Sequence, residues 1–196
     1  MGDHPGGRAR RADDFLDAFV SHARELRVGD PLDPATDVGP MVSASRRAKV
    51  EAQVETALAS GAELVVGGDR AGRDRGHFFA PAVVTGAAAE TDLLREETFG
   101  PVAPIVPVAS LDEAIELANS TRFGLGANVY TRDLETAVRC LREIRAGTVW
   151  INDPLTDNDA GPFGGFKQSG MGRELGVEGL EAFLETKHVH IDRCWR

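Results

Sequence analysis

Residues 102–152, VAPIVPVASLDEAIELANSTRFGLGANVYTRDLETAVRCLREIRAGTVWIN, alternate between two hydrophobic periodicities. Short apolar runs rich in valine and isoleucine are typical of strands, whereas apolar residues three or four positions apart are typical of helices. The expected elements are strands at 102–108, 125–131 and 148–152, and helices at 110–120 and from 134 to Gly147. Strands that alternate with helices over short connections predict an α/β fold with a mostly parallel, doubly wound sheet.

The flanking segments extend this pattern in both directions. Residues 1–12 have no apolar period and predict a frayed tail, and residues 29–40 hold three prolines and predict a loop. Upstream we expect helices at 13–28 and 43–60, a strand at 62–68, an extended segment at 78–86 and a helical turn at 92–97. Downstream we expect a helix at 179–187 and a short last strand at 188–191.

Composition and charge exclude several classes of protein. The 196 residues carry a formal net charge of −9, which disfavours nucleic acid and anionic membrane surfaces as partners. The chain has no run of about 18 apolar residues and no secretory signal, so neither a membrane span nor export is expected. Two cysteines form no disulfide framework. The cytoplasm is therefore the expected compartment.

Two stretches carry more unusual residues than folding requires. In REETFGPVAP (95–104), the acids belong either to a solvated helix end or to a binding loop. In a binding loop, the Glu97 carboxylate would accept hydrogen bonds from a vicinal diol, and Phe99 would offer a flat face to an aromatic ring. The second stretch, 152–176, follows a strand and predicts either a functional loop or a mobile surface loop. Its GGFKQSG run leaves a phosphate-binding nest open as a further alternative.

The single cysteine and histidine positions favour structural roles. Cys140 lies inside a helical pattern and is expected to fill core space. Cys194, near the end, is expected to be exposed. His188 and His190 share one face of the expected last strand, without other metal ligands beside them.

Four blocks, in order along the chain, carry a family resemblance. They are VGDPLDPATDVGPMVS (28–43), EETFGPV (96–102), GTVWIN (147–152) and GPFGGFKQSGMGRELG (161–176). Together they resemble the NAD(P)-dependent aldehyde dehydrogenase superfamily, and the last block is similar in wording to betaine-aldehyde and semialdehyde dehydrogenases. The resemblance implies oxidation of an aldehyde to a carboxylic acid, with hydride transfer to NAD or NADP. A cysteine thiolate attacks the aldehyde and a carboxylate activates water in that chemistry.

The resemblance also implies roles for individual residues. For the cofactor it implies that Glu97 binds the nicotinamide ribose, that Phe99 packs beside the ring, and that Arg46 and Lys49 contact the adenine-side ribose. For the substrate tunnel it implies Asn152, Asp153 and Phe163, with residues 153–160 tuning substrate choice. For potassium it implies Lys167 and Gly170, and for a charge relay it implies Glu174.

The resemblance covers only the C-terminal two fifths of such an enzyme. The family nucleophile lies in a G-Q-x-C context and the general base in an E-L-G-G-K context, and neither string occurs in this sequence. We therefore expect a chain that is inactive alone, divided into an unmatched tail (1–12), a partial catalytic domain (13–186) and a C-terminal oligomerisation strand with its tail (187–196). The implied partners are a small aldehyde and either further copies or a complementary N-terminal half. The alternative is a non-catalytic assembly or binding module that pairs with a full-length subunit.

Overall fold

The structure, a computed structural model, describes residues 5–153 and 158–192 and divides into two compact units. Unit 1 is Met1–Leu117 and unit 2 is Ala118–Arg196. Unit 1 holds α1 (Pro5–Glu25), α2 (Ala44–Ala59), β1 (Glu63–Val66), β2 (Ala82–Thr85), α3 (Asp92–Arg95) and β3 (Val102–Ile105). The boundary falls within α4 (Leu111–Asn119). Unit 2 holds β4 (Phe123–Gly124), β5 (Gly126–Val129), α5 (Leu134–Glu143), β6 (Thr148–Ile151), β7 (Phe166–Lys167) and α6 (Gly176–Glu181).

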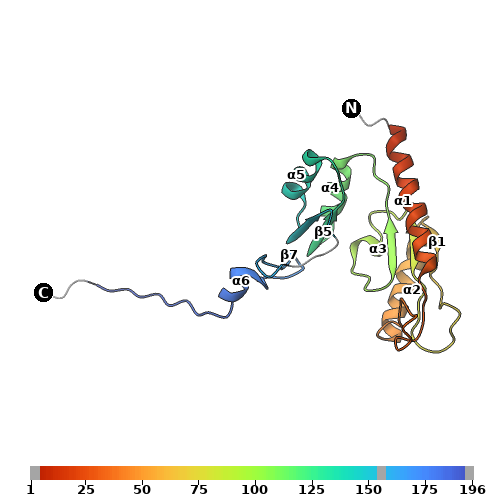
Figure 1. Ribbon diagram of the computed structural model, residues 1–196, viewed down its shortest axis with the longest axis horizontal. Helices are drawn as coiled ribbons and strands as arrows, with labels where there is room; N and C mark the ends of the chain where they lie inside the picture. Colours follow the sequence, from red (N-terminus) through yellow and green to blue (C-terminus); the bar gives the residue numbers. More distant parts are fainter. Residues whose placement is uncertain (1–4, 154–157, 193–196) are drawn as a thin grey trace. The chain divides into compact units, whose positions relative to one another are not determined.

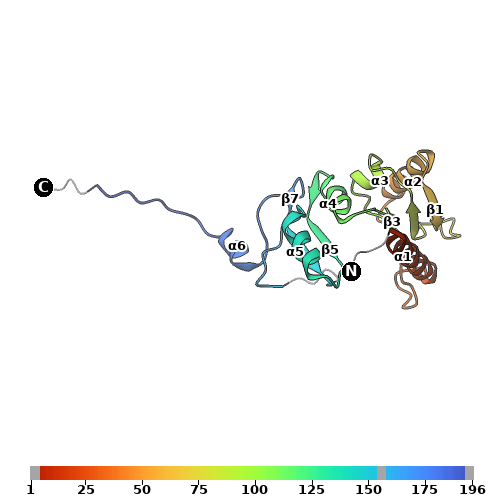
Figure 2. The same ribbon diagram turned by 90° about the horizontal axis from the view of Figure 1, so that it is seen from above.

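Unit 1 is a three-stranded sheet covered on both faces by helices. The strand order is β1-β2-β3, with β1 antiparallel and β3 parallel to the central β2. Successive side chains of β2 point to opposite faces. Ala82 and Val84 pack with the buried face of α2, whereas Val83 packs with Val20 and Ala23 of α1. Figure 2 shows α1 and α2 on opposite sides of these strands.

Both ends of α2 follow from its sequence. The Ser43 hydroxyl accepts a hydrogen bond from the Arg46 amide at 3.2 Å and caps the N-terminus. At the other end Gly61 adopts a φ of +99°, a conformation that glycine adopts without steric cost. The Ala62 amide then donates to the Ala57 carbonyl at 3.0 Å, which closes the turn in the Schellman manner. The helix predicted at 43–60 is confirmed.

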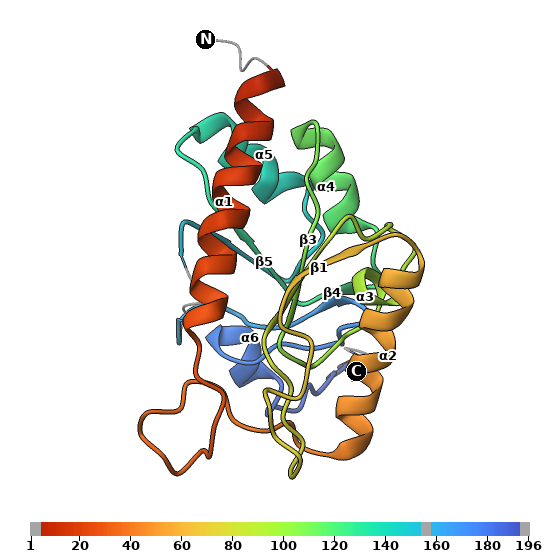
Figure 3. The same ribbon diagram turned by 90° about the vertical axis from the view of Figure 1, so that its right-hand side faces the viewer.

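The first helix differs from its prediction at both ends. It begins at Pro5, so the tail predicted at 1–12 is wrong for residues 5–12, and it ends at Glu25 instead of Val28. It ends there because residues 27–29 bond with the loop that joins α1 to α2. Figure 3 shows the course of this loop. The Arg27 amide donates to the Asp37 carboxylate at 2.8 Å, and Val28 pairs with Val38. The Arg27 and Gly29 amides thus donate to the loop and not to the carbonyl four residues earlier in the helix.

Unit 2 contains the parallel pair that the alternating pattern predicted. β5 and β6 are parallel, with Asn128 opposite Trp150, and α5 connects them. A second, antiparallel pair, β4-β7, was not predicted because it is only two residues long on each side. The α/β class is confirmed. The described residues form three small sheets, and a doubly wound sheet is not among them.

The N-cap of α5 gives unit 2 a pH-dependent contribution to stability. The Asp133 carboxylate accepts from the Thr136 amide at 2.7 Å. Hydrogen bonding from the Thr136 side chain, and then from its amide, lowers the pKa of Asp133 below its ordinary value of 3.8. A lowered folded-state pKa stabilises the fold above pH 3.8, and this contribution is lost as the pH falls through the folded-state pKa.

We therefore expect Asp133→Ala to lower the Tm at pH 7, with a difference from wild type that shrinks toward pH 3. Asp133→Asn is the matched control, because asparagine caps helices well without a titrating group. Circular dichroism melts across this pH range measure the effect. A Tm difference between wild type and Asp133→Ala that has the same size at every pH would contradict this prediction.

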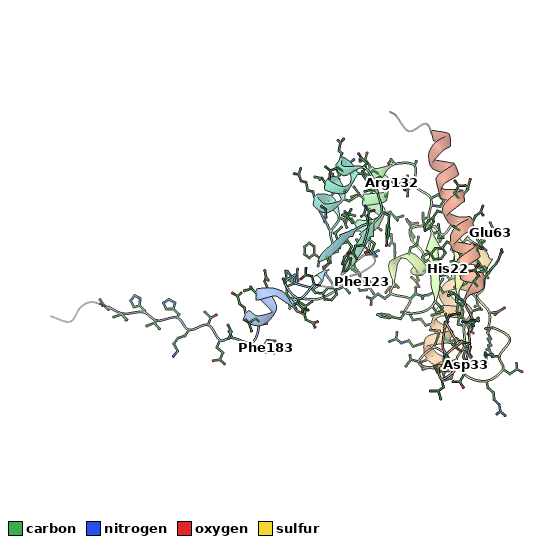
Figure 4. The ribbon with its side chains drawn as sticks, in the orientation of Figure 1. His22, Asp33, Glu63, Phe123, Arg132 and Phe183 are labelled. Atoms are coloured by element: carbon green, nitrogen blue, oxygen red, sulfur yellow. The ribbon has the colours of Figure 1, made fainter. Side chains whose placement is uncertain are left out.

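The C-terminal part differs most from prediction. The helix expected at 179–187 is α6, which begins at Gly176 and ends at Glu181. The strand predicted at 188–191 is not confirmed, because those residues are exposed and lie in no sheet of this structure (Figure 1). A strand needs a neighbour for its backbone N–H and C=O groups, and these residues have none in the described part of the chain. Phe183, labelled in Figure 4, is 89% exposed.

No helix in the described ranges is both long and apolar enough to span a bilayer.

Candidate functional site

The turn at residues 96–101, between α3 and β3, carries two exposed candidate groups, Glu97 and Phe99. Glu97 is exposed, and the structure records no hydrogen bond or ion pair for its carboxylate among the described residues. Phe99 is 70% exposed and has a φ of +47°. A positive φ is a strained conformation for a bulky residue, and such strain is maintained only where the surroundings hold it. The turn therefore has one defined conformation, in which a carboxylate and an aromatic ring are exposed.

Helix α2 contacts this turn through a hydrogen bond from Lys49 and through close packing of Val50. The Lys49 ammonium donates to the Glu97 carbonyl oxygen at 2.8 Å, across 48 residues of sequence. One residue further, Val50 packs so closely under Gly100 that an added Cβ would lie 2.6 Å from the Val50 Cγ2 atom. A side chain at position 100 would have to displace the Val50 side chain. The Ala82 amide donates to the Pro101 carbonyl at 2.8 Å and joins the end of the turn to the sheet.

A groove of about 460 Å³ runs beside the turn. Its wall on one side is the end of the loop between α1 and α2, and on the other side it is Phe99, Gly100 and Pro101. Arg46 lines the same groove from α2. The lining residues are Val38, Gly39, Pro40, Met41, Val42, Arg46, Phe99, Gly100 and Pro101.

The structure thus brings together the predicted residues Arg46, Lys49, Glu97 and Phe99 in unit 1. The Lys49 ammonium donates to the backbone carbonyl of Glu97, a contact that the sequence did not predict. Met41 and Val42 were also missed as groove residues. Their only signal was the Gly-Pro pair before them, which marks a turn without saying what the turn faces.

The glycine-rich stretch of unit 2 forms a hairpin-like loop. Phe163 and Glu174 pair across it, with amide-to-carbonyl distances of 2.8 and 2.7 Å. A second groove, of about 300 Å³, is lined by both of these residues together with Gly170 and Met171. Arg173 lines it too, and its guanidinium donates to the Gly165 and Gly172 carbonyls at 3.2 and 2.6 Å. Arg173 therefore holds the loop in shape, a role that the sequence did not indicate.

Lys167 lies in the same loop, with its side chain turned to the end of α4. Its ammonium donates to the carbonyls of Asn119 and Thr121, each at 3.0 Å. The Asn119 side chain in turn bonds the Glu143 carbonyl at 2.8 Å and the Arg145 amide at 2.7 Å. Asn119 thus links three segments of unit 2, and its position at a helix end was the only sequence signal for it.

A potassium ion at Lys167 and Gly170 would have to be bound by backbone carbonyls, because neither side chain offers an oxygen. Hard monovalent cations accept such carbonyl ligands. The Lys167 ammonium already satisfies two of the nearby carbonyls. Within the described ranges, no group of three or more His, Cys, Asp or Glu residues could hold a metal ion.

Asn152 has a structural partner in unit 2. Its side-chain amide exchanges two hydrogen bonds with the backbone of Thr131, at 2.8 and 2.7 Å, and ties the ends of β5 and β6 together. Asp153 follows it and is half-buried. Of the predicted substrate-tuning stretch, residues 154–157 lie outside the described residues.

Cys140 fills core space, as predicted. It is 2% exposed on the inner face of α5, and burial raises the pKa of its thiol. A buried thiol with a raised pKa is a poor nucleophile. The other cysteine, Cys194, lies outside the described residues.

Comparisons with known proteins match almost the whole chain. The profile of the Aldehyde dehydrogenase family matches residues 8–189. Succinate-semialdehyde dehydrogenase (NADP(+)) 1 of Mycobacterium tuberculosis strain H37Rv is 47% identical over 179 residues, which cover 91% of this chain and 39% of that protein. The corresponding Mycobacterium leprae enzyme is 44% identical over the same length.

Solved structures of aldehyde dehydrogenases also match this chain. Betaine aldehyde dehydrogenase from Staphylococcus aureus in complex with NAD+ has a TM-score of 0.84 and 38% identity, and the match covers 94% of this chain and 38% of that one. An aldehyde dehydrogenase mutant from Bacillus cereus has a TM-score of 0.85 and 37% identity, covering 90% of this chain and 36% of that one. The chain spans about 39% of the length of the first curated relatives that it matches.

Proposed function

This chain belongs to the aldehyde dehydrogenase family, and we propose that it supplies the nicotinamide-side cofactor contacts of a cytoplasmic enzyme that oxidises a small aldehyde to a carboxylic acid. One observation carries the proposal. The turn at 96–101 presents a carboxylate and an aromatic ring beside a groove of about 460 Å³ that also contains a guanidinium group. This set of groups fits the riboside end of NAD(P)+, which is a diol beside a flat, cationic ring.

Each group has a distinct task in this proposal. The two oxygens of Glu97 accept hydrogen bonds from the two ribose hydroxyls, which fixes the rotation of the riboside. Phe99 packs beside the ring and limits the access of water to it. Arg46 gives the groove a positive charge in a chain of net charge −9, and Lys49 adds a second cation at the turn, which favours an anionic cofactor. When bound, NAD(P)+ supplies the hydride acceptor.

The groove of unit 2 belongs to the aldehyde side of the proposal. Phe163 would line the substrate tunnel, and its pairing with Glu174 would hold the ring in place. Asn152 and Asp153 would lie at the tunnel mouth, with Asn152 held by Thr131. Glu174 would take part in proton movement, and Lys167 and Gly170 would contact a potassium ion through backbone carbonyls.

We expect Glu97→Gln to impair cofactor binding much more than folding. The chain is combined with the N-terminal three fifths of the Mycobacterium tuberculosis relative, and the KM for NADP+ is measured. Hydrogen bonds to a charged group contribute about 1.5–3 kcal/mol, so the variant should raise KM by about tenfold or more. Glu90→Gln, which neutralises another exposed acid of unit 1, is the matched control. Unchanged kcat and KM in Glu97→Gln would remove Glu97 from the site.

A second candidate function is pairing with a full-length subunit without a contribution to chemistry. Its support is the apolar surface at the C-terminal end, where Phe183, Leu184, Val189 and Ile191 are all exposed. Exposed apolar residues beside unpaired backbone favour association with another chain. In the enzyme proposal, the same surface would form a homo-oligomer. A chain that joins a full-length relative without changing its NADP+ affinity would favour the module.

A further inference from the structure

We propose that Lys49 is a positioning residue, which sets the direction of the Glu97 carboxylate by holding the Glu97 backbone from helix α2. The inference rests on the proposed function of Glu97 as a cofactor ligand. It departs from the role in direct ribose contact that the family resemblance implies for Lys49. Its basis is the hydrogen bond of 2.8 Å from the Lys49 ammonium to the Glu97 carbonyl oxygen.

The turn needs such an anchor because its own backbone is strained. Phe99 has a φ of +47°, which a bulky side chain adopts only when its surroundings enforce it. Relaxation of Phe99 would rotate the peptide planes on both sides and change the direction of the Glu97 carboxylate. Two residues before Phe99, the Lys49 bond prevents the start of the turn from following such a rotation.

The other contacts that fix the turn lie after Phe99. The contact that fixes the backbone of Glu97 comes from Lys49. Gly100 rests on Val50, and the Pro101 carbonyl accepts from the Ala82 amide at 2.8 Å. Before the turn, the Glu96 amide still bonds the Asp92 carbonyl at 2.9 Å, at the end of α3. Between these points, among residues 5–153 and 158–192, the only side-chain hydrogen bond to the backbone of residues 97–99 comes from Lys49. Because Lys49 and Val50 are neighbours on α2, one helix holds the turn at both ends.

The exchange of backbone amides in the turn tests this role directly. Hydrogen–deuterium exchange with mass spectrometry follows the Glu96 and Val102 amides, which flank the turn and donate to the Asp92 and Gly100 carbonyls. In Lys49→Met we expect these amides to exchange about five- to tenfold faster while the other amides of unit 1 keep their rates, since one charge-assisted hydrogen bond is lost locally. Lys49→Arg keeps a cation on a long side chain and should restore slow exchange. Arg75→Met removes an exposed cation from the same unit and should change nothing.

Titration with NADPH, followed by its fluorescence, is run on the same proteins combined with the N-terminal three fifths of the Mycobacterium tuberculosis relative, and it separates this inference from the proposed function. If both hold, Lys49→Met weakens NADPH binding and Lys49→Arg restores it. If wild type binds no NADPH but the turn opens in Lys49→Met, the positioning role stands and the cofactor role of this chain fails. Unchanged exchange in Lys49→Met overturns the positioning role, and so does faster exchange throughout unit 1 with a lowered Tm.

Discussion

The purified 196-residue chain is expected to form no reduced nicotinamide from any aldehyde above the background of the buffer. The family chemistry needs a cysteine thiolate that can reach the aldehyde carbonyl. Cys140 cannot act in this way, because it is 2% exposed within α5 and burial raises the pKa of its thiol. The sequence also contains no E-L-G-G-K string for the general base. Loss of a nucleophile that acts in concert with a base lowers kcat by about 10⁶-fold in hydrolases, and we expect a loss of this order.

Absorbance of the reduced cofactor measures this, with the Mycobacterium tuberculosis relative assayed beside the chain. Aldehydes of different size and charge are tested with both NAD+ and NADP+. Turnover by this chain alone that disappears in Glu97→Gln would contradict the prediction. Turnover that survives in Glu97→Gln would instead point to a contaminating enzyme.

Gly147→Ala is expected to give the largest loss of stability in unit 2. Gly147 precedes β6, and its amide donates to the Gly124 carbonyl at 3.0 Å. An added Cβ at this position would overlap the carbonyl oxygen of Gly164. Both groups that would collide are fixed backbone, so neither a rotamer change nor a side-chain shift relieves the overlap. We expect a cost near the upper end of that for overpacked cores, about 3 kcal/mol.

Urea unfolding followed by tryptophan fluorescence measures this cost, because Trp150 lies in β6 itself. Gly161→Ala is the matched control in the same glycine-rich loop. A Cβ there would lie 3.4 Å from the Asn158 carbonyl oxygen, an ordinary contact, and should change stability by no more than about 0.5 kcal/mol. Equal effects of the two substitutions would show that the backbone contact between Gly147 and Gly164 is not tight in solution.

Elements with local signals were predictable from the sequence. The capping serine and the terminal glycine of α2 lie at its ends, and the structure uses both. The alternation of 125–152 likewise predicted the parallel pair β5-β6. In each case the deciding contacts join residues within a few positions of one another, or follow from a regular apolar period.

Elements that depend on distant partners were not predictable in the same way. Residues 188–191 have the composition of a strand, but pairing needs a neighbour that the pattern cannot supply. The end of α1 is decided by bonds from residues 27–29 to the loop around Asp37, ten residues away. Two of the predicted cofactor residues, Arg46 and Phe99, line one groove of unit 1, and the roles of the candidate site residues stay predictions. The contact of Lys49 with the Glu97 carbonyl spans 48 residues and depends on how α2 packs under the turn.

A crystal structure of the complemented enzyme with NADP+ tests the central claim most directly. The claim is that this chain holds the nicotinamide ribose through Glu97. The predicted result is that both ribose hydroxyls lie about 2.5–3.0 Å from the Glu97 carboxylate oxygens, with Phe99 against the ring. A cofactor whose ribose hydroxyls are bound by other residues, with Glu97 left in solvent, would contradict the account.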